Sequence, residues 1–269
     1  MGDGFRDAEL RGWTERASGY DKHFRAISGQ LTTPLLLALE TVSGRRILDV
    51  CCGPGHLAAS LTEEGAEVFG IDFAPTMIDL AVRHYPELDF VVGDAEALAF
   101  PSEEFNHVVC AYGVMHLNEP DRAIAEAFRV LRPSGKYVFS QWAHDDELLA
   151  LVAAAIADHG EPIAGLQNAP PPMRFSDPNE CMRTLSTHGF INSRVERVDV
   201  RWVGEHPGDM LRLIKEAATR AALLIESQVP ERRMAIEAAI MAWGCERLDD
   251  RGVAMRRPTL LAIGEKPVP

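Results

Sequence analysis

Apolar positions along this chain follow two different spacings. Between residues 46 and 142, short apolar runs of strand length alternate with segments whose apolar residues recur every three to four positions, as on one face of a helix. Strands that alternate with helices in this way are typical of a mostly parallel sheet with helices on both faces. The expected strands are 47–50, 67–72, 88–92, one within 105–117, and 137–142, and the expected helices are 57–64, 75–84 and 121–131.

The two ends of the chain have a more helical pattern. Near the C-terminus, two helices separate the last two expected strands, and the first of them carries an apolar stripe that fits either a substrate-facing lid or ordinary core packing. The stripe consists of Met210, Leu213, Ile214, Ala217, Ala221, Leu224 and Ile225. The elements expected outside 46–142 are helices at 7–17, 20–28, 34–41, 148–157, 175–188, 209–226 and 230–243, and strands at 192–203 and 257–264.

The most informative stretch is 46–57, Arg-Ile-Leu-Asp-Val-Cys-Cys-Gly-Pro-Gly-His-Leu. This stretch predicts a buried strand, a tight turn at Gly53-Pro54-Gly55 and the start of a helix. Together they can form a binding site of nucleotide size, because glycine has no Cβ and lets the backbone approach a ligand. Gly53-x-Gly55-x-x-Ala58, followed by Asp72, also satisfies the dinucleotide fingerprint. An NAD-dependent oxidoreductase is therefore one interpretation of this stretch.

A carboxylate in the same strand favours a different ligand. Asp49 lies four residues before Gly53, and no Lys or Arg follows in the turn. A negative side chain suits a positively charged ligand better than a pyrophosphate. S-adenosylmethionine carries a sulfonium and an ammonium group and no phosphate. The stretch resembles the first motif of the class I, Rossmann-like S-adenosylmethionine-dependent methyltransferases, (Val/Leu)-Leu-Asp-(Val/Leu)-Gly-x-Gly-x-Gly, with Cys51 in place of the first glycine.

Later segments resemble further motifs of this family in the same order. The segment 72–77, Asp-Phe-Ala-Pro-Thr-Met, is similar to Asp-x-Ser-x-x-Met, in which the Met packs on the adenine, and Asp72 at a strand tip can accept both ribose hydroxyls. The segment 93–98 is similar to Gly-Asp-Ala-(Glu/Gln)-x-Leu, and Asp94 there can accept a hydrogen bond from the adenine amine. A dinucleotide site has no special need of this third acid. The resemblance covers about residues 20–143 and is to small-molecule methyltransferases, similar to those of ubiquinone and menaquinone biosynthesis.

The resemblance implies a Rossmann-like α/β fold, with a seven-stranded, mostly parallel sheet, helices on both faces, and N-terminal and C-terminal helical cap elements. The expected divisions are an N-terminal helical lid at 1–41, a cofactor-binding core at 42–145, and the remainder of the sheet at 146–269 with a cap insertion at about 205–248. The implied cofactor is S-adenosylmethionine. Its expected contacts are Tyr20, Asp49, Cys51, Gly53, Gly55, Asp72, Phe73, Met77, Asp94, Ala95 and Ala111.

The activity implied is methyl transfer to a small-molecule acceptor, whose reacting atom (O, N or C) stays open. Alignment alone could suffice, because the sulfonium methyl is already activated. His116, just beyond the fourth strand, is the candidate catalytic residue if the acceptor must lose a proton. A catalytically idle S-adenosylmethionine-binding protein would share every cofactor motif and is the main alternative. No metal site is expected, since His144-Asp145-Asp146 precedes a helix that acids usually cap.

Composition narrows the class of partner. The chain has 269 residues, of which 46% are hydrophobic and 25% charged, as in ordinary globular proteins. Its net charge of −13 argues against a nucleic-acid partner, since phosphate binding needs clustered Lys and Arg. No apolar run approaches the ~20 residues of a membrane span, and no signal-peptide pattern is seen. Five cysteines without metal spacing fit a reducing compartment, so we expect a cytoplasmic enzyme of open oligomeric state with no membrane or nucleic-acid partner.

Overall fold

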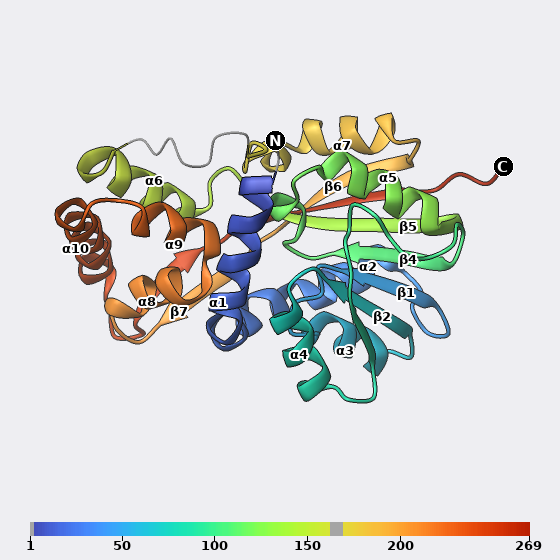
Figure 1. The fold of residues 1–269 in the computed structure, drawn as a ribbon, viewed down its shortest axis with the longest axis horizontal. Helices are drawn as coiled ribbons and strands as arrows, with labels where there is room; N and C mark the ends of the chain where they lie inside the picture. Colours follow the sequence, from blue (N-terminus) through green and yellow to red (C-terminus); the bar gives the residue numbers. More distant parts are fainter. Residues whose placement is uncertain (1–2, 162–168) are drawn as a thin grey trace.

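The computed structural model describes residues 3–161 and 169–269. A seven-stranded sheet forms its centre, in the order β3-β2-β1-β4-β5-β9-β6 (Figure 1). The neighbours among β1 to β5 are parallel, whereas β9 is antiparallel to both β5 and β6. The predicted seven-stranded, mostly parallel sheet is confirmed. Its strands are β1 (Arg46–Val50), β2 (Glu67–Asp72), β3 (Asp89–Val92), β4 (Phe105–Cys110), β5 (Leu131–Trp142), β6 (Ile191–Val198) and β9 (Thr259–Glu265).

Helices cover both faces of this sheet, because successive strand residues point to opposite sides. On β1, Ile47 belongs to the apolar core shared with α2, α3 and α4, whereas Leu48 belongs to the core shared with α5 and α7. Both side chains are fully buried, as expected for a parallel strand that is covered on two sides. The covering helices are α2 (Thr32–Leu39), α3 (His56–Glu63), α4 (Pro75–His84), α5 (Pro120–Val130) and α7 (Pro178–Thr187).

One long helix, α1 (Asp3–Ser28), begins the described chain and lies between the sheet and the remaining helices (Figure 1). The prediction of two helices at 7–17 and 20–28 is wrong, because α1 continues through Gly19. A Cβ at Gly19 would lie 2.1 Å from the backbone oxygen of Glu216. The glycine therefore permits a close approach of another helix and does not end α1.

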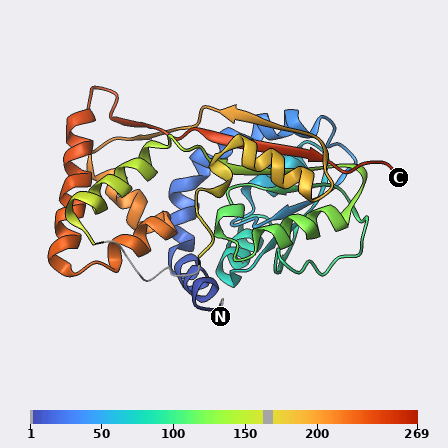
Figure 2. The same cartoon turned by 90° about the horizontal axis from the view of Figure 1, so that it is seen from above.

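A helical cap lies beyond α1, on the side away from the sheet (Figures 1 and 2). The prediction of a single helix at 209–226 is wrong, since the chain leaves helical geometry at Ala218, with φ −94° and ψ 80°. The cap consists of α6 (Glu147–His159), α8 (Gly208–Ala217), α9 (Thr219–Glu226), α10 (Pro230–Arg247) and a separate two-stranded sheet of β7 (Arg201–Gly204) and β8 (Val253–Arg256).

The strand predicted at 192–203 is divided between the two sheets as β6 and β7, whereas the strand predicted at 257–264 corresponds to β9, and β8 precedes it as a strand that was not predicted. Val198 pairs with Thr259 in the main sheet, and Arg201 pairs with Arg256 in the small one. The same two segments thus pair twice, with an interruption at 199–200 and 257–258. Pro258 has no N–H to continue the ladder, which accounts for the interruption.

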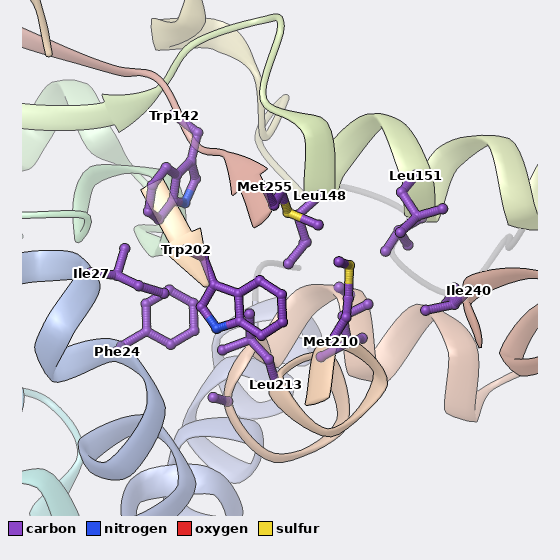
Figure 3. Packing of buried hydrophobic residues seen from close by; sticks show 14 of the residues in the cluster. Phe24, Ile27, Trp142, Leu148, Leu151, Trp202, Met210, Leu213, Ile240 and Met255 are labelled. Atoms are coloured by element: carbon purple, nitrogen blue, oxygen red, sulfur yellow. The ribbon is translucent and has the colours of Figure 1, made fainter. Parts of the chain in front are cut away.

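α1 and the cap share one apolar core (Figure 3). Figure 3 shows Phe24 of α1 beside Trp202 of β7, with Leu213 and Met210 of α8 close to them. These side chains are all buried, so α1 is fastened to the cap by apolar contact. No helix within 3–161 and 169–269 combines the length and the apolar character that a membrane span requires.

Candidate active site

The turn after β1 contains three residues with left-handed backbone geometry. Cys51, Gly53 and Gly55 have φ values of 58°, 53° and 82°. Cys51 thus adopts the conformation that glycine favours, at the position where the family motif has a glycine. Gly55 meets a second constraint, because a Cβ there would lie 2.6 Å from Cζ of Phe90. The turn therefore keeps its glycine-type path despite the cysteine.

Asp72, at the end of β2, braces this turn. Its Oδ2 accepts a hydrogen bond from the backbone N–H of Gly53 (3.0 Å), and its Oδ1 accepts one from that of Ala74 (2.9 Å). Burial raises the pKa of Asp72 to about 6, although these hydrogen bonds favour the ionised form. The carboxylate is thereby fixed next to the turn at the tip of its strand.

Asp49 lies inside β1, where it is 1% exposed. Its Oδ2 is buried without a hydrogen-bond partner. Burial, and after it the charge of Asp72, raise the pKa of Asp49 to about 8. An ionised carboxylate is costly in such a place unless a positive charge lies nearby. This part of the site therefore favours a cation.

The turn opens onto a cavity at the carboxyl ends of β1 to β4, which we call the strand-end cavity. Nine of the eleven predicted cofactor contacts line it. The two exceptions are Asp49, which is enclosed in the sheet, and Gly55, which packs on Phe90. The predicted residues that line it are Tyr20, Cys51, Gly53, Asp72, Phe73, Met77, Asp94, Ala95 and Ala111.

One face of α1 closes the strand-end cavity. Arg6, Trp13 and Tyr20 all line it, and their spacing of seven residues places them on the same side of the helix. The remaining free volume is about 60 Å³, well below the ~300–1,000 Å³ of small-molecule sites. Of these three residues, only Tyr20 was predicted as a cofactor contact. Arg6 and Trp13 could have been found by stepping back seven and fourteen residues from Tyr20 along the same face of the helix.

Tyr20 lies directly over the glycine turn. Its Cε1 is 3.7 Å from the position of a Cβ on Gly53, and its ring stacks on Phe24 at 4.9 Å. Burial, together with the charges of Asp72 and Asp49, raises the pKa of the Tyr20 phenol. The phenol therefore keeps its proton and is a hydrogen-bond donor toward the cavity.

Asp94, which follows β3, is joined to α1. Its Oδ2 pairs with Nη1 of Arg6 at 2.8 Å, and its Oδ1 accepts a hydrogen bond from the backbone N–H of Glu96. The pair is partly exposed, so it contributes little to stability. A carboxylate has about four lone-pair positions. Asp94 can therefore accept a further hydrogen bond from a ligand.

His116, in the short helix η2 (Val114–His116), is oriented by Glu9 of α1. Its Nδ1 lies 2.8 Å from Oε2 of Glu9, whose Oε1 accepts a hydrogen bond from Nε of Arg220 (2.7 Å). Burial raises the pKa of Glu9, but His116 and Arg220 outweigh burial and lower it overall. Glu9 is therefore a carboxylate to which Nδ1 donates, which leaves Nε2 as the basic atom of the neutral ring. Sequence analysis missed Glu9 and Arg220, which lie far from His116 in the chain.

A second cavity of about 390 Å³ adjoins the first. Trp13, Tyr20, Tyr112 and His116 border both cavities. We call it the cap cavity, because its other walls come mainly from the cap and are mostly apolar. They include Phe24, Met115, Trp142, Leu148, Val152, Ile156, Met173, Ala217, Ala221 and Leu224.

The predicted apolar stripe on 210–225 is divided between core and cavity wall. Met210, Leu213 and Ile214 are fully buried in the core that joins α1 to the cap. Ala217 and Ala221 also belong to that core and line the cap cavity as well. The first part of the stripe is thus core, and its later part is a cavity wall.

The strands whose carboxyl ends line the strand-end cavity lie within a segment that matches a known protein family. Residues 47–135 match a family model described as a methyltransferase domain. The segment from β1 into β5 is therefore similar to methyltransferases. The predicted resemblance to class I methyltransferases is thereby confirmed.

Curated relatives of this segment include demethylmenaquinone methyltransferases. That of Renibacterium salmoninarum is 37% identical over 107 residues, which are 40% of this chain and 45% of the relative. That of Thermus thermophilus is 43% identical over 108 residues, which are 38% of this chain and 49% of the relative. The chain thus spans less than half the length of these relatives.

Solved structures resemble a larger part of the chain. The YcgJ protein from Bacillus subtilis has a TM-score of 0.60 at 18% identity, covering 90% of this chain and 100% of its own. Phosphoethanolamine N-methyltransferase 2 from Haemonchus contortus has a TM-score of 0.57 at 16% identity, covering 89% of this chain and 53% of its own. At these identities the likeness shows the fold alone.

The acids considered as metal ligands have other partners. Asp146 caps α6 by accepting a hydrogen bond from Leu149 N–H and pairs with Arg257, and Asp145 pairs with Arg197. In the part of the chain that the structure describes, no group of three or more His, Cys, Asp or Glu side chains is placed to hold a metal ion.

Proposed function

We propose that this protein is an S-adenosylmethionine-dependent methyltransferase that acts on a small-molecule acceptor. The observation that carries the proposal is the common border of two cavities. The strand-end cavity is formed by the segment 47–135 and α1, and the cap cavity adjoins it across Trp13, Tyr20, Tyr112 and His116. Methyl transfer needs two ligands in contact, because alignment of the reacting atoms is most of the catalysis.

The residues of the strand-end cavity fit S-adenosylmethionine. Asp72 would accept the ribose hydroxyls and Asp94 the adenine amine, with Met77 packed on the adenine. The unpartnered, buried Oδ2 of Asp49 favours a ligand with positive charge, as argued above. When bound, S-adenosylmethionine supplies a methyl group activated by its sulfonium. Because only about 60 Å³ of the cavity is free, binding would displace lining side chains such as Tyr20.

His116 is the residue that we propose removes a proton from the acceptor. Its ring borders both cavities, and Glu9 holds Nδ1 so that Nε2 is the basic atom. A positioned histidine is a suitable general base near neutral pH. The aromatic side chains of Trp13, Tyr20 and Tyr112 border both cavities beside it.

The sequence relatives support the reaction class and not a particular acceptor. They are named demethylmenaquinone and 2-phytyl-1,4-naphthoquinone methyltransferases. The matched residues in the first of them amount to 40% of this chain, and the family match at 47–135 leaves out α1 and most of the cap cavity. A mostly apolar cavity and a net charge of −13 fit a small molecule better than a nucleic acid.

Product analysis tests the proposal. The protein would be incubated with small-molecule extracts and S-adenosylmethionine carrying a deuterated methyl group, and mass spectrometry would search for compounds that acquire the label. We expect at least one labelled product that requires active protein. Cofactor binding without any labelled product across such extracts would instead favour a catalytically idle binding protein.

A further inference from the structure

The two sides of α1 are held by different kinds of contact. Toward the cap, Phe24 and Ile27 are buried in the large apolar core that α1 shares with it. Toward the sheet, α1 contributes Ala17 to a much smaller apolar cluster with Ala74 and Met77. Because apolar burial contributes most to stability, α1 should separate from the sheet more readily than from the cap. Polar contacts on the sheet side join Arg6 to Asp94, Glu9 to His116, and Asp21 to His56 and His84.

Entry of a ligand into the strand-end cavity requires side chains of α1 to move, because only about 60 Å³ of the cavity is free. Tyr20 of α1 lies over the glycine turn and lines this cavity. The next residue, Asp21, makes polar contacts that fasten this part of α1 to the sheet side. A change in the strength of these contacts should therefore change how readily the cavity opens.

Asp21 bonds to histidines from two other helices. Its Oδ1 lies 2.6 Å from Nε2 of His56, the first residue of α3, and His56 directly follows Gly55 of the turn. Its Oδ2 lies 3.0 Å from Nε2 of His84, the last residue of α4. One carboxylate thus joins α1 to both α3 and α4. We call Asp21, His56 and His84 the Asp21 clamp.

The surroundings of His56 suit both of its charge states. Burial lowers the pKa of His56, with Arg25 and His84 acting in the same direction and Asp21 opposing them. The neutral ring can donate from Nε2 to Asp21 and accept at Nδ1 from the Tyr85 hydroxyl, which lies 2.9 Å away. Because a tyrosine hydroxyl can also accept, the ring can gain a proton at Nδ1 and keep both contacts.

A proton on either ring strengthens its bond to Asp21, because an imidazolium and a carboxylate attract each other as opposite charges. Both rings are partly exposed, at 15% and 34% of the side chain, so solvent protons reach them and water moderates the effect. Arginine and glutamate ordinarily keep their charges between pH 5 and 8, whereas histidine changes its charge there. The other charged groups around the clamp are Arg25 of α1, Glu63 of α3 and Glu87 beyond α4.

We propose that the Asp21 clamp is a pH-dependent fastening of α1, which protonation of His56 or His84 tightens, so that acid slows the exchange of ligands in the strand-end cavity. The proposal rests on the proposed function only in taking S-adenosylmethionine and S-adenosylhomocysteine as those ligands. Release of a product from beneath a closed element often limits turnover. The clamp would therefore regulate how long the spent cofactor stays bound.

Release of tritiated S-adenosylhomocysteine, chased with unlabelled compound at pH 6 and pH 8 and at constant ionic strength, tests the proposal. Asp21→Asn keeps the shape and an acceptor oxygen but removes the charge. It should speed release at both pH values, and by about three- to tenfold more at pH 6 than at pH 8. The ratio of variant rate to unmodified rate is the readout, because Asp49, Asp72 and His116 are present in both proteins. Equal ratios at the two pH values would overturn the proposal.

A control and a second variant guard against indirect effects. Asp7→Asn removes the same charge from an exposed position on the same helix and should leave the ratio near one at both pH values. His84→Gln removes one of the two rings at a partly exposed position, so the fold should tolerate it. It should change the ratio in the same direction as Asp21→Asn, by a smaller factor. Melting curves confirm that each variant is folded.

Alkylation of Cys51 by a methanethiosulfonate tests the clamp without any ligand. Cys51 lines the strand-end cavity close to Tyr20, and Cys245 on α10 is exposed and serves as the internal reference. Asp21→Asn should speed the reaction of Cys51 relative to Cys245, and more at pH 6 than at pH 8. An unchanged relative rate would contradict the clamp. Absence of S-adenosylhomocysteine binding to the unmodified protein, together with a faster reaction of Cys51 in the variant, would contradict the proposed function instead.

Discussion

The two cavities of this protein are built in different ways. The strand-end cavity takes most of its lining from turns that follow four neighbouring strands, between Cys51 and Asn118. The cap cavity takes its lining from segments as far apart as Trp13 and Arg257, on α1, α6, α9 and the chain between β8 and β9. Local sequence motifs specify the first kind of site, whereas the second kind depends on which distant elements meet.

Removing the base at the common border should have the largest effect. His116→Ala should lower kcat by roughly 10²–10⁴-fold while leaving S-adenosylhomocysteine affinity nearly unchanged. The rate of the unmodified enzyme should also be lower in acid, because a protonated imidazole cannot accept a proton. Both are measured with the acceptor found by product analysis. A variant that keeps most of its kcat and the same pH profile would show that alignment alone suffices.

Truncations along α8 and α9 should separate core from cavity wall. Leu213→Ala empties a site that is fully buried in the core of α1 and the cap, and should cost about 2–5 kcal/mol of unfolding free energy. Leu224→Ala should cost less than about 1 kcal/mol, because its half-buried side chain already faces a cavity. Urea denaturation measures both. Equal losses would show that the cap cavity wall is packed like core.

Substitution of Asp72 tests cofactor binding in the strand-end cavity only. If its carboxylate holds the ribose, Asp72→Ala should weaken cofactor binding by roughly 1.5–3 kcal/mol, the range for a hydrogen bond to a charged group. The melting curve should remain cooperative, although Gly53 and Ala74 lose a hydrogen-bond acceptor. Calorimetry with S-adenosylhomocysteine gives the affinity. An unchanged value would assign Asp72 to bracing the turn.

The raised pKa of Asp49 predicts that the stability of the fold depends on pH. Its folded pKa of about 8 lies above the ordinary value of 3.8, so between pH 6 and 8 the folded state holds a proton that the unfolded state has lost. Stability should therefore fall with rising pH in this window by up to about 1.4 kcal/mol per pH unit from this group. Asp72, whose pKa is about 6, adds to the slope only at the lower end. Asp49→Asn should flatten the dependence, and an unchanged slope in urea titrations would contradict the assignment.

The contrast between the cavities also explains what could be predicted from the sequence. The mostly parallel sheet and the nine predicted contacts that line the strand-end cavity followed from patterns and motifs whose parts lie within a few residues of each other. The continuity of α1 could not be predicted in that way. Gly19 reads as a helix break, and only its contact with Glu216 reveals why a glycine lies there. Gly12 has the same role, since a Cβ on it would lie 2.4 Å from Cγ2 of Thr219.

The buried ion pairs of the cap also could not be predicted from the sequence. Asp146 reads as a helix cap and does cap α6, but its pairing with Arg257 joins residues 111 positions apart. The same holds for Glu9 with His116 and Arg220. Such pairs leave no spacing signal, because each partner is chosen by tertiary packing. The chemistry of the cap cavity therefore had to come from the structure.

Calorimetric titration of the unmodified protein with S-adenosylmethionine, S-adenosylhomocysteine and NAD tests the central claim most directly. We propose that the carboxyl ends of β1 to β3, with Asp49, Asp72 and Asp94, bind an adenosyl ligand that carries positive charge. This predicts binding of both adenosyl compounds at one site per chain and no binding of NAD. Saturable binding of NAD, with no heat from either adenosyl compound, would contradict it.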